Sequence, residues 1–415
     1  MTAIEEWVEV YQDLHRNPEL SFQETRTAAI VADRLTAMGY DVTTGVGGTG
    51  VVGLLRNGDG PVVLLRADMD GLPVEEKTGL GYASSVRGVD DEGNDVAVMH
   101  ACGHDVHVTC LLAACDALAM DRASWSGTLM AVFQPAEEKG AGALAMLEDG
   151  LYERFATPSV VLGQHVAPLP AGVIGLRAGA TFATSDGVRI VLHGRGAHGS
   201  RPEASVDPVV MAAATVMRLQ TIVSREVGGS EVAVVTVGKL SAGTVINVIP
   251  DSAEILINVR TFDAGVQERV LAAIGRIARG EAAAAGAPRE PDVEHLSSFP
   301  AVVNDAAAVE RTRPALAGVS MAVVDPGLVT GSEDVGTLAT AAGVPCVFWL
   351  LGGADPAEFA GLTSIEAIAD KARTIPSNHS PLYAPVPEPT LANGAAALVA
   401  AAREWLGAPS GATAE

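Results

Sequence analysis

The chain has 415 residues, of which 48% are hydrophobic, and its formal net charge at pH 7 is -23. This length suffices for two domains with packed cores. The acidic balance argues against nucleic acid as a partner, because phosphate binding needs clustered Lys and Arg. No uninterrupted stretch of about 18 apolar residues occurs, so we expect no membrane span and no membrane partner.

The N-terminal segment predicts an amphipathic helix. Apolar side chains recur at helical spacing at Ile4, Trp7, Val8, Tyr11 and Leu14, with acidic residues between them. The segment has neither the basic start nor the apolar stretch of a signal peptide. The four cysteines form no regular disulfide framework, which suggests a reducing compartment. We therefore expect a cytoplasmic protein.

The glycine-rich segment Gly45-Val-Gly-Gly-Thr-Gly50 fits the dinucleotide-binding pattern G-x-G-x-x-G. The residues that follow it form a β-type run, however, and no helix is there to bind a pyrophosphate. A turn between two strands is the better interpretation, and a nicotinamide-dependent enzyme is disfavoured.

The chain contains two patterns of secondary structure. Apolar strand runs at 51–55, 62–65, 128–133 and 160–162 alternate with helical segments, which predicts an α/β sheet covered by helices. A β-α-β-β-α-β order, typical of a ferredoxin-like unit, then begins near residue 187. Its expected elements are strand 188–192, helix 208–223, strand 232–237, strand 253–260, helix 267–284 and strand 293–297.

Cys102 and His104 are candidate metal ligands. Two residues apart on a continuous helix, they would point in nearly opposite directions, so they must lie on a loop or at a helix start. The apolar run 106–120 predicts that helix, with His104 in its first turn. A thiolate there could bridge two cations, and a metal pair lowers the pKa of bound water toward roughly 7. Alternatively, Cys102 is a small buried hydrophobic residue and His104 a capping residue.

Glu137 and Glu138 follow the strand 128–133 and Pro135, where a loop opens at the carboxyl end of a sheet. Neighbouring side chains diverge there, so one carboxylate can bind metal while the other acts as a general base. His165 follows the run 160–162 and is expected at another strand end. Taken alone, such a Glu pair is more often solvated surface.

The candidate ligands, with His379 near the C-terminus, lie on both sides of the ferredoxin-like unit. Residues 1–180 and 298–415 should therefore form one discontinuous catalytic domain. Residues 181–297 then form an inserted domain that acts as a lid.

Many ordered motifs run nearly from end to end of the chain. They are Leu14-His-Arg-Asn-Pro-Glu-Leu-Ser21, Arg66-Ala-Asp-Met-Asp-Gly-Leu-Pro73, His100-Ala-Cys-Gly-His-Asp105, Gln134-Pro-Ala-Glu-Glu138, Gly194-Arg-Gly-Ala-His-Gly199, Ile246-Asn-Val-Ile-Pro250, Gly331-Ser-Glu-Asp334 and His379. Together they resemble the zinc or manganese amidohydrolases and peptidases that include aminoacylases, carboxypeptidase G, hippurate hydrolase and auxin-conjugate hydrolases, and they match the hippurate and auxin-conjugate branch best. The resemblance implies a zinc-peptidase-like α/β catalytic domain with an inserted ferredoxin-like lid and dimerisation domain.

Position by position, the resemblance implies two divalent metal ions, zinc or manganese, with cobalt or nickel as alternatives. The implied metal ligands are Cys102, His104, Glu138, His165 and His379. It also implies that Glu137 is the general base and that Asp70 orients the site. Asp68 stands where much of the wider family has a metal-binding histidine, a departure that the hippurate branch shares, so Asp68 is not assigned as a ligand.

The implied substrate-binding residues belong to the inserted domain. His198 would stabilise the oxyanion, often from the partner subunit of a homodimer formed through that domain. Asn247 and Arg260 would hold the substrate carboxylate, for which the Arg fork is suited. Alternatively, His198 is a surface loop residue and Arg260 forms a salt bridge across the sheet.

The resemblance therefore implies hydrolysis of N-acyl-L-amino acids to a carboxylic acid and a free amino acid. A dipeptidase or carboxypeptidase of the same family is an alternative, because the acyl pocket cannot be inferred from the sequence. A catalytically silent metal-binding or ligand-binding relative is a third, disfavoured because Glu137 and every candidate ligand are present.

Overall fold

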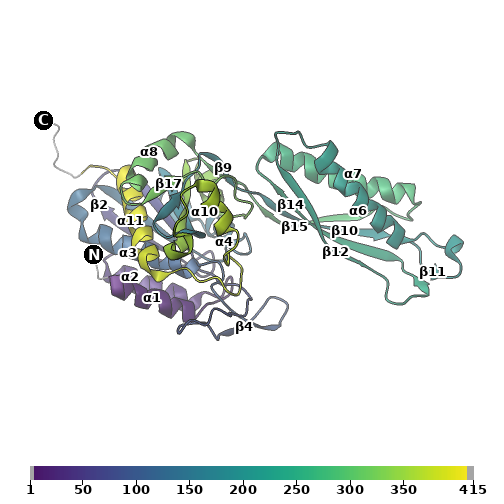
Figure 1. The fold of residues 1–415 in the computed structure, drawn as a ribbon, viewed down its shortest axis with the longest axis horizontal. Helices are drawn as coiled ribbons and strands as arrows, with labels where there is room; N and C mark the ends of the chain where they lie inside the picture. The colour runs from purple at the N-terminus through teal and green to yellow at the C-terminus, as the bar shows by residue number, and fades with distance from the viewer. Residues whose placement is uncertain (1–3, 409–415) are drawn as a thin grey trace. The chain divides into compact units, whose positions relative to one another are not determined.

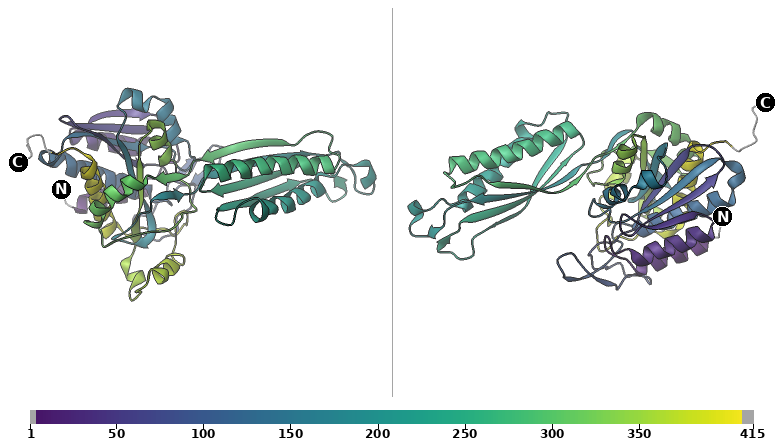
Figure 2. Two further views of the ribbon diagram at one scale, coloured as in Figure 1. Left: turned by 90° about the horizontal axis from the view of Figure 1, so that it is seen from above. Right: turned by 180° about the vertical axis from the view of Figure 1, so that it is seen from behind.

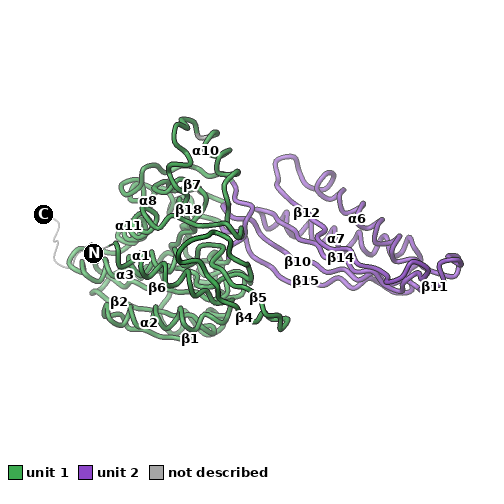
Figure 3. Tube along the Cα trace, turned by 60° about the horizontal axis from the view of Figure 1, so that its bottom comes forward, with its two compact units in different colours: residues 1–179, 303–327, 334–415 green, residues 180–302, 328–333 purple. Residues whose placement is uncertain are grey.

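The computed structural model describes residues 4–408, and the chain divides into two compact units (Figure 3). Unit 1 comprises Met1–Gly179, Val303–Gly327 and Asp334–Glu415, so it is discontinuous in sequence. Unit 2 comprises Ala180–Val302 and the short segment Leu328–Glu333. The sequence-based division assigns this short segment to the catalytic domain instead.

Unit 1 is built on an eight-stranded mixed sheet in the order β1-β2-β6-β3-β7-β18-β8-β17. The strands are β1 (Asp41–Val46), β2 (Gly50–Asn57), β3 (Val62–Asp68), β6 (Gly127–Gln134), β7 (Val160–Pro170), β8 (Val173–Gly175), β17 (Ala322–Val324) and β18 (Cys346–Ala354). The central neighbours β6, β3, β7 and β18 run parallel to one another. Their carboxyl ends therefore meet at one edge, where an α/β sheet places its functional residues.

Helices cover this sheet (Figure 1). They are α1 (Ile4–Arg16), α2 (Thr25–Ala37), α3 (His104–Met120), α4 (Gly142–Glu148), α5 (Leu151–Arg154), α8 (Ala306–Ala317), α9 (Val335–Ala342), α10 (Ile365–Ala372) and α11 (Pro387–Trp405). The helix α3 packs against β3, β7 and α11. It is buried on nearly every side, as expected for a helix whose residues are apolar all round. A two-stranded hairpin, β4 (Arg87–Val89) with β5 (Asp95–Ala97), precedes α3.

Unit 2 contains a separate antiparallel sheet in the order β12-β14-β10-β15. In chain order its elements are β10 (Ser185–His193), α6 (Pro208–Arg225), β12 (Ala233–Ala242), β14 (Ser252–Thr261), α7 (Ala264–Ala284) and β15 (Asp292–Phe299). This is the predicted β-α-β-β-α-β order. The two helices run side by side along one face of the sheet (Figure 2), and the inward residues of β10 and β14, such as Ile190 and Ile257, form the core with them.

Two further short strands of unit 2, β11 (Ala197–His198) and β13 (Val248–Ile249), pair as a ribbon. The remaining short strands are β9 (Gly179–Phe182) and β16 (Val302–Asn304). Within the described part of the chain, none of the helices combines the length and apolar character needed to cross a membrane.

The glycine-rich segment Gly45–Gly50 is a turn between strands, as predicted. It joins β1 to β2, which pair antiparallel. Gly47 has a positive φ of 64°, and a Cβ at this position would lie 2.5 Å from the backbone nitrogen of Met146. These glycines therefore serve a tight turn and a close approach.

Candidate metal centre

Cys102 and His104 lie where the loop after β5 turns into α3. His104 is the first residue of α3, and Cys102 lies two residues before it, so the predicted helix start is confirmed. Gly103 between them has a φ of +83°, and a Cβ there would lie 2.4 Å from Val166 Cγ1. Only glycine satisfies both constraints.

Glu137 and Glu138 follow β6 on a tight corner. Pro135 leaves the sheet and Ala136 has a positive φ of 47°, which is unusual for a residue with a side chain. The carbonyl of Ala136 accepts the backbone N–H groups of Ala141 and Gly142 at 3.3 and 3.2 Å. The corner is therefore closed by its own backbone.

His165 lies within β7, which continues to Pro170, and not at the end of a strand as predicted. The reason is that β18 pairs with β7 along this extension. The pairing of β7 with β3 on its other side stops at Gly163, so that side of β7 is open where His165 lies. His379, on the loop before α11, has a φ of +71° and donates its backbone N–H to Ala101 O at 2.7 Å.

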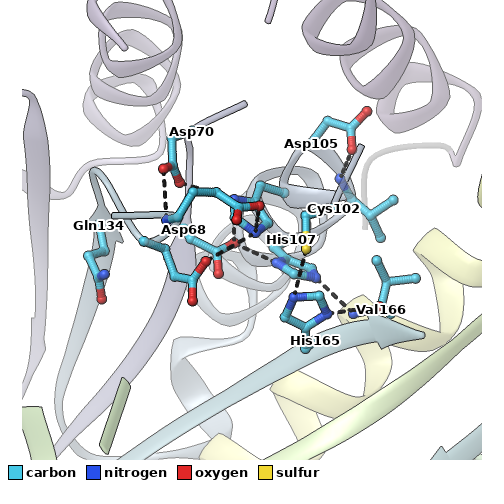
Figure 4. Close-up of polar contacts among 12 residues, drawn as sticks. Asp68, Asp70, Cys102, Asp105, His107, Gln134, His165 and Val166 are labelled. Carbon is cyan, nitrogen blue, oxygen red and sulfur yellow. Dashed lines mark hydrogen bonds and ion pairs between the residues drawn. The ribbon is translucent and has the colours of Figure 1, made fainter. Parts of the chain in front are cut away.

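These side chains converge into two groups that share Cys102. The possible ligand atoms of Cys102, His104 and His165 lie within 4.8 Å of one another, and so do those of Cys102, Glu138 and His379. Cys102 Sγ is 3.4 Å from His165 Nε2 (Figure 4). The contact from Glu138 Oε2 to His379 Nε2 is also 3.4 Å. A thiol in both groups is suited to bridge two cations.

His165 and His104 each hold Nδ1 in a polar contact away from the other candidate ligands, which leaves Nε2 to face them. His165 donates its Nδ1–H to Val166 O at 2.8 Å, and His104 Nδ1 is 3.1 Å from Asp70 Oδ1. In the neutral form of each ring the proton stays on Nδ1, so that Nε2 carries the lone pair that binds a metal. Burial lowers the pKa of His165 well below its usual value, which favours the neutral ring a metal requires.

The donor set fits divalent metal ions. Among the described residues, the buried atoms His104 Nε2 and Glu138 Oε1 have no hydrogen-bond partner in the protein, which is costly unless a ligand engages them. Burial, followed by the charge of Glu138, raises the pKa of the Cys102 thiol well above its usual value. Nearby cations would reverse that shift and deprotonate the thiol.

Glu137 belongs to neither Cys102 group. Its side chain is buried, and its Oε2 lies 3.8 Å from His104 Nε2. Its carboxylate is thus beside the candidate ligands, and its possible ligand atom lies within 4.8 Å of those of His104 and Glu138.

Asp70 connects three parts of the site. Besides contacting His104, its Oδ2 accepts the Ser21 hydroxyl at 2.7 Å and the Glu138 N–H at 3.0 Å. Burial alone would raise the pKa of Asp70, but the hydrogen bond to His104 lowers it below its usual value. An ionised carboxylate is therefore fixed behind His104.

Asp68, which was not assigned as a ligand, is held by two basic groups. Arg66 donates to its Oδ2 at 2.6 Å. His107 Nδ1 contacts its Oδ1 at 2.5 Å (Figure 4). Since His107 Nε2 accepts the Val166 N–H at 2.8 Å, the ring proton is on Nδ1 and is donated to Asp68. These contacts occupy both carboxylate oxygens of Asp68 and both nitrogens of His107.

Sequence reasoning missed Arg66, His107 and Asn378. The Asn378 amide donates to Cys102 O at 3.0 Å and to Val166 O at 3.1 Å, so it ties the Cys102 loop to the strand of His165. Its position beside His379 was the available signal, but nothing in the spacing showed the partners of its amide.

The three predicted substrate residues lie in unit 2, and the structure does not bring them all together. His198 and Asn247 meet at the β11–β13 ribbon, where Gly199 N–H donates to Asn247 O at 2.8 Å. The ribbon follows the end of β10 at His193, which pairs with Ser252 at the start of β14. Arg260 lies near the other end of β14. Eight residues of strand separate Ser252 from Arg260, about 26 Å at the usual rise.

Within the described residues 4–408, Arg260 forms no salt bridge across the sheet. Its guanidinium donates to the neutral oxygens Asn258 Oδ1 at 3.0 Å, Thr330 O at 2.6 Å and Ser332 Oγ at 3.1 Å. His198 is exposed, with Nδ1 2.7 Å from the hydroxyl of Ser200.

Comparison with known proteins decides the family, because residues 64–372 match the sequence signature of peptidase family M20/M25/M40. The chain belongs to this family. Membership confirms the predicted relationship and makes the protein a hydrolase of amide bonds.

The M20 chain is 36% identical over 335 residues to the N-acetyl-L-cysteine deacetylase of Bacillus subtilis. The matched region covers 80% of this chain and 77% of the relative. The chain is 42% identical over 281 residues to the hippurate hydrolase of Campylobacter jejuni, covering 67% and 70%.

A solved M20 structure agrees with the fold. The chain superimposes on a dinuclear metal-binding M20 peptidase of Bacillus subtilis with a TM-score of 0.77 at 30% identity, covering 97% of this chain and 98% of that one. The α/β fold predicted from the sequence is thereby confirmed.

Proposed function

We propose that this protein is a metal-dependent amidohydrolase that cleaves N-acyl-L-amino acids into a carboxylic acid and a free amino acid. The observation that carries the proposal is the pair of ligand groups sharing Cys102, with the Glu137 carboxylate beside them. The similarity to a deacetylase of N-acetylcysteine and to a hippurate hydrolase supports an N-acyl amino acid as substrate.

The proposed metal ligands are Cys102, His104, Glu138, His165 and His379. Two divalent cations, zinc or manganese, would polarise the amide carbonyl and lower the pKa of water toward about 7. Asp70 keeps the His104 ring in the tautomer that presents Nε2, through the 3.1 Å contact with Nδ1.

Glu137 is the proposed general base. It takes a proton from the attacking water, whose oxygen bonds to the amide carbon, and passes that proton to the nitrogen as the C–N bond breaks. The products are then a carboxylic acid and an amine, with no other reactant. A positioned carboxylate base contributes about 10² to 10⁴ in rate.

The residues of unit 2 are proposed to bind the substrate. Among the described residues Arg260 makes no ion pair, and its contacts are neutral oxygens, so its charge suits a substrate carboxylate. Asn247 would assist in that contact. His198 would donate to the oxyanion, a role worth about 2.7 to 4 kcal/mol in comparable sites.

Arg260 lies about 26 Å of strand from Ser252, the end of β14 at which the ribbon of His198 follows β10. This placement supports a homodimer, formed through unit 2, in which His198 serves the partner's site. Mixing Glu137→Ala and His198→Ala subunits tests this. One competent site would be restored in each mixed dimer, giving about a quarter of wild-type activity after random exchange. No recovery, with mixed dimers verified by mass spectrometry, would show that His198 acts within its own chain.

Three of the four cysteines, Cys102, Cys110 and Cys115, are free and buried, which supports the proposed location in the reducing cytoplasm.

The deciding experiment measures release of free amino acid from N-acetyl, N-benzoyl and indole-acetyl amino acids and from dipeptides. Enzyme is loaded separately with Zn²⁺ and Mn²⁺, and Glu137→Ala is the control. Metal-dependent turnover of the acyl substrates, lost in the variant, is expected. Turnover confined to dipeptides would assign a dipeptidase instead, and metal binding without turnover of any substrate would contradict catalysis.

A further inference from the structure

Glu24 is a buried carboxylate that the proposed reaction does not use. It precedes α2 in sequence and is fully inaccessible to solvent. Its partners come from three separate segments: the backbone N–H of Phe22, the hydroxyl of Thr49 and the backbone N–H of Ala136. A buried carboxylate that collects three donors fixes their relative positions.

The contact with Ala136 is the one that reaches the reaction site. Glu24 Oε1 accepts the Ala136 N–H at 2.8 Å and the Phe22 N–H at 3.0 Å. Ala136 is itself buried and has a left-handed φ of 47°. Its carbonyl is already fixed by Ala141 and Gly142, so Glu24 supplies the remaining restraint on this residue.

The conformation of Ala136 sets the direction in which the next residue, Glu137, leaves the corner. An alanine leaves the left-handed region readily unless its surroundings hold it there. Without an acceptor its buried N–H would be unpaired, which favours rotation toward another partner. Rotation would carry the Glu137 carboxylate away from its position 3.8 Å from His104 Nε2.

The same segment also reaches the other side of the site. Ser21, three residues before Glu24, donates its hydroxyl to Asp70, which accepts the Glu138 N–H. Glu138 is thus restrained through Asp70, whereas Ala136 is restrained through Glu24. This division allows the base to be disturbed while the ligands stay in place.

We propose that Glu24 is a positioning residue for the general base: its buried carboxylate holds the left-handed Ala136 and thereby aims Glu137. The inference rests on the proposed function. The acceptor oxygen is what matters, because both backbone partners are neutral N–H groups.

The test compares substitutions at Glu24 with a matched control in the same segment. Glu24→Ala removes the acceptor, whereas Glu24→Gln keeps a carbonyl oxygen at the same reach. The control is Glu19→Ala. The Glu19 carboxylate accepts the N–H groups of Arg26 and Thr27 in the first turn of α2, and within the described part of the chain it makes no hydrogen bond to the Ala136 corner.

We expect Glu24→Ala to lower kcat about 100-fold, the effect of displacing a reacting group by about 1 Å, with KM changed less than about threefold. Elemental analysis should still find the wild-type metal content. Glu24→Gln should recover kcat to within about tenfold of wild type, and Glu19→Ala should match Glu24→Ala in lost thermal stability but keep wild-type kcat. A crystal structure of metal-loaded Glu24→Ala should show Ala136 outside the left-handed region.

The proposal is overturned if kcat of Glu24→Ala stays within threefold of wild type, if Glu19→Ala loses as much kcat, or if metal content falls in proportion to kcat. Ala136 unchanged in the variant structure would also overturn it. Absence of turnover in the wild type refutes the proposed function instead, so the two failures are distinguishable.

Discussion

Replacing Gly103 by alanine should destabilise the protein by about 2 to 5 kcal/mol and weaken metal binding. A residue with a side chain in the left-handed region costs about 1 to 2 kcal/mol. The added Cβ would also lie 2.4 Å from Val166 Cγ1, and forced overpacking in a core costs about 1 to 3 kcal/mol. Relief of the clash must move either the loop of Cys102 and His104 or the strand of His165.

Gly343→Ala is the matched control for strain alone. Gly343 follows α9 with a φ of +66°, and a Cβ there meets nothing within 4 Å. It should therefore lose only about 1 to 2 kcal/mol, while metal affinity stays at the wild-type value.

Urea unfolding of the metal-free proteins measures the first effect, and titration with Zn²⁺ against a competing chelator measures the second. Equal losses of stability in the two variants, or wild-type metal affinity in Gly103→Ala, would refute the reasoning that contact with Val166 fixes the ligand loop.

Three further predictions concern charge and hydrogen bonding. Burial alone would lower the pKa of His15, but the Asp105 and Glu76 carboxylates raise it to about 9. Protonated His15 should therefore add about 3 kcal/mol to the free energy of unfolding below pH 6.5, and this contribution should be lost as pH rises through 9. Urea unfolding of His15→Asn should not show this pH-dependent loss. Metal binding at pH 7 should release about two protons, one from the Cys102 thiol and one from His104. Burial lowers the pKa of His104, but Asp68 and Asp70 raise it on balance to about 10. Calorimetry in buffers of different ionisation enthalpy counts the released protons, and a count of zero would contradict the assignment of these ligands. Asn378→Ala should weaken metal binding about 10- to 100-fold, because the side-chain amide that hydrogen-bonds both Cys102 O and Val166 O is lost. An unchanged metal affinity in the chelator titration would show that these two hydrogen bonds are not needed for binding.

Local signals in the sequence predicted two of the three secondary-structure placements around the site. The two-residue spacing of Cys102 and His104, followed by the apolar run 106–120, predicted a helix start, and α3 begins at His104. The strand run before Pro135 predicted the loop of Glu137, which follows β6. His165 was placed at a strand end wrongly, because its strand is extended by pairing with β18, almost 200 residues later in the chain.

Apolar periodicity in the sequence predicted the helices, the strands and their order, and the ordered motifs predicted the family. Tertiary structure decided the partners of polar side chains. Glu24 meets Ala136 across 112 residues, and Arg66 meets Asp334 across 268. Such pairs leave no periodic pattern, since a hydrogen bond depends on where two distant backbones meet and not on the spacing along either one.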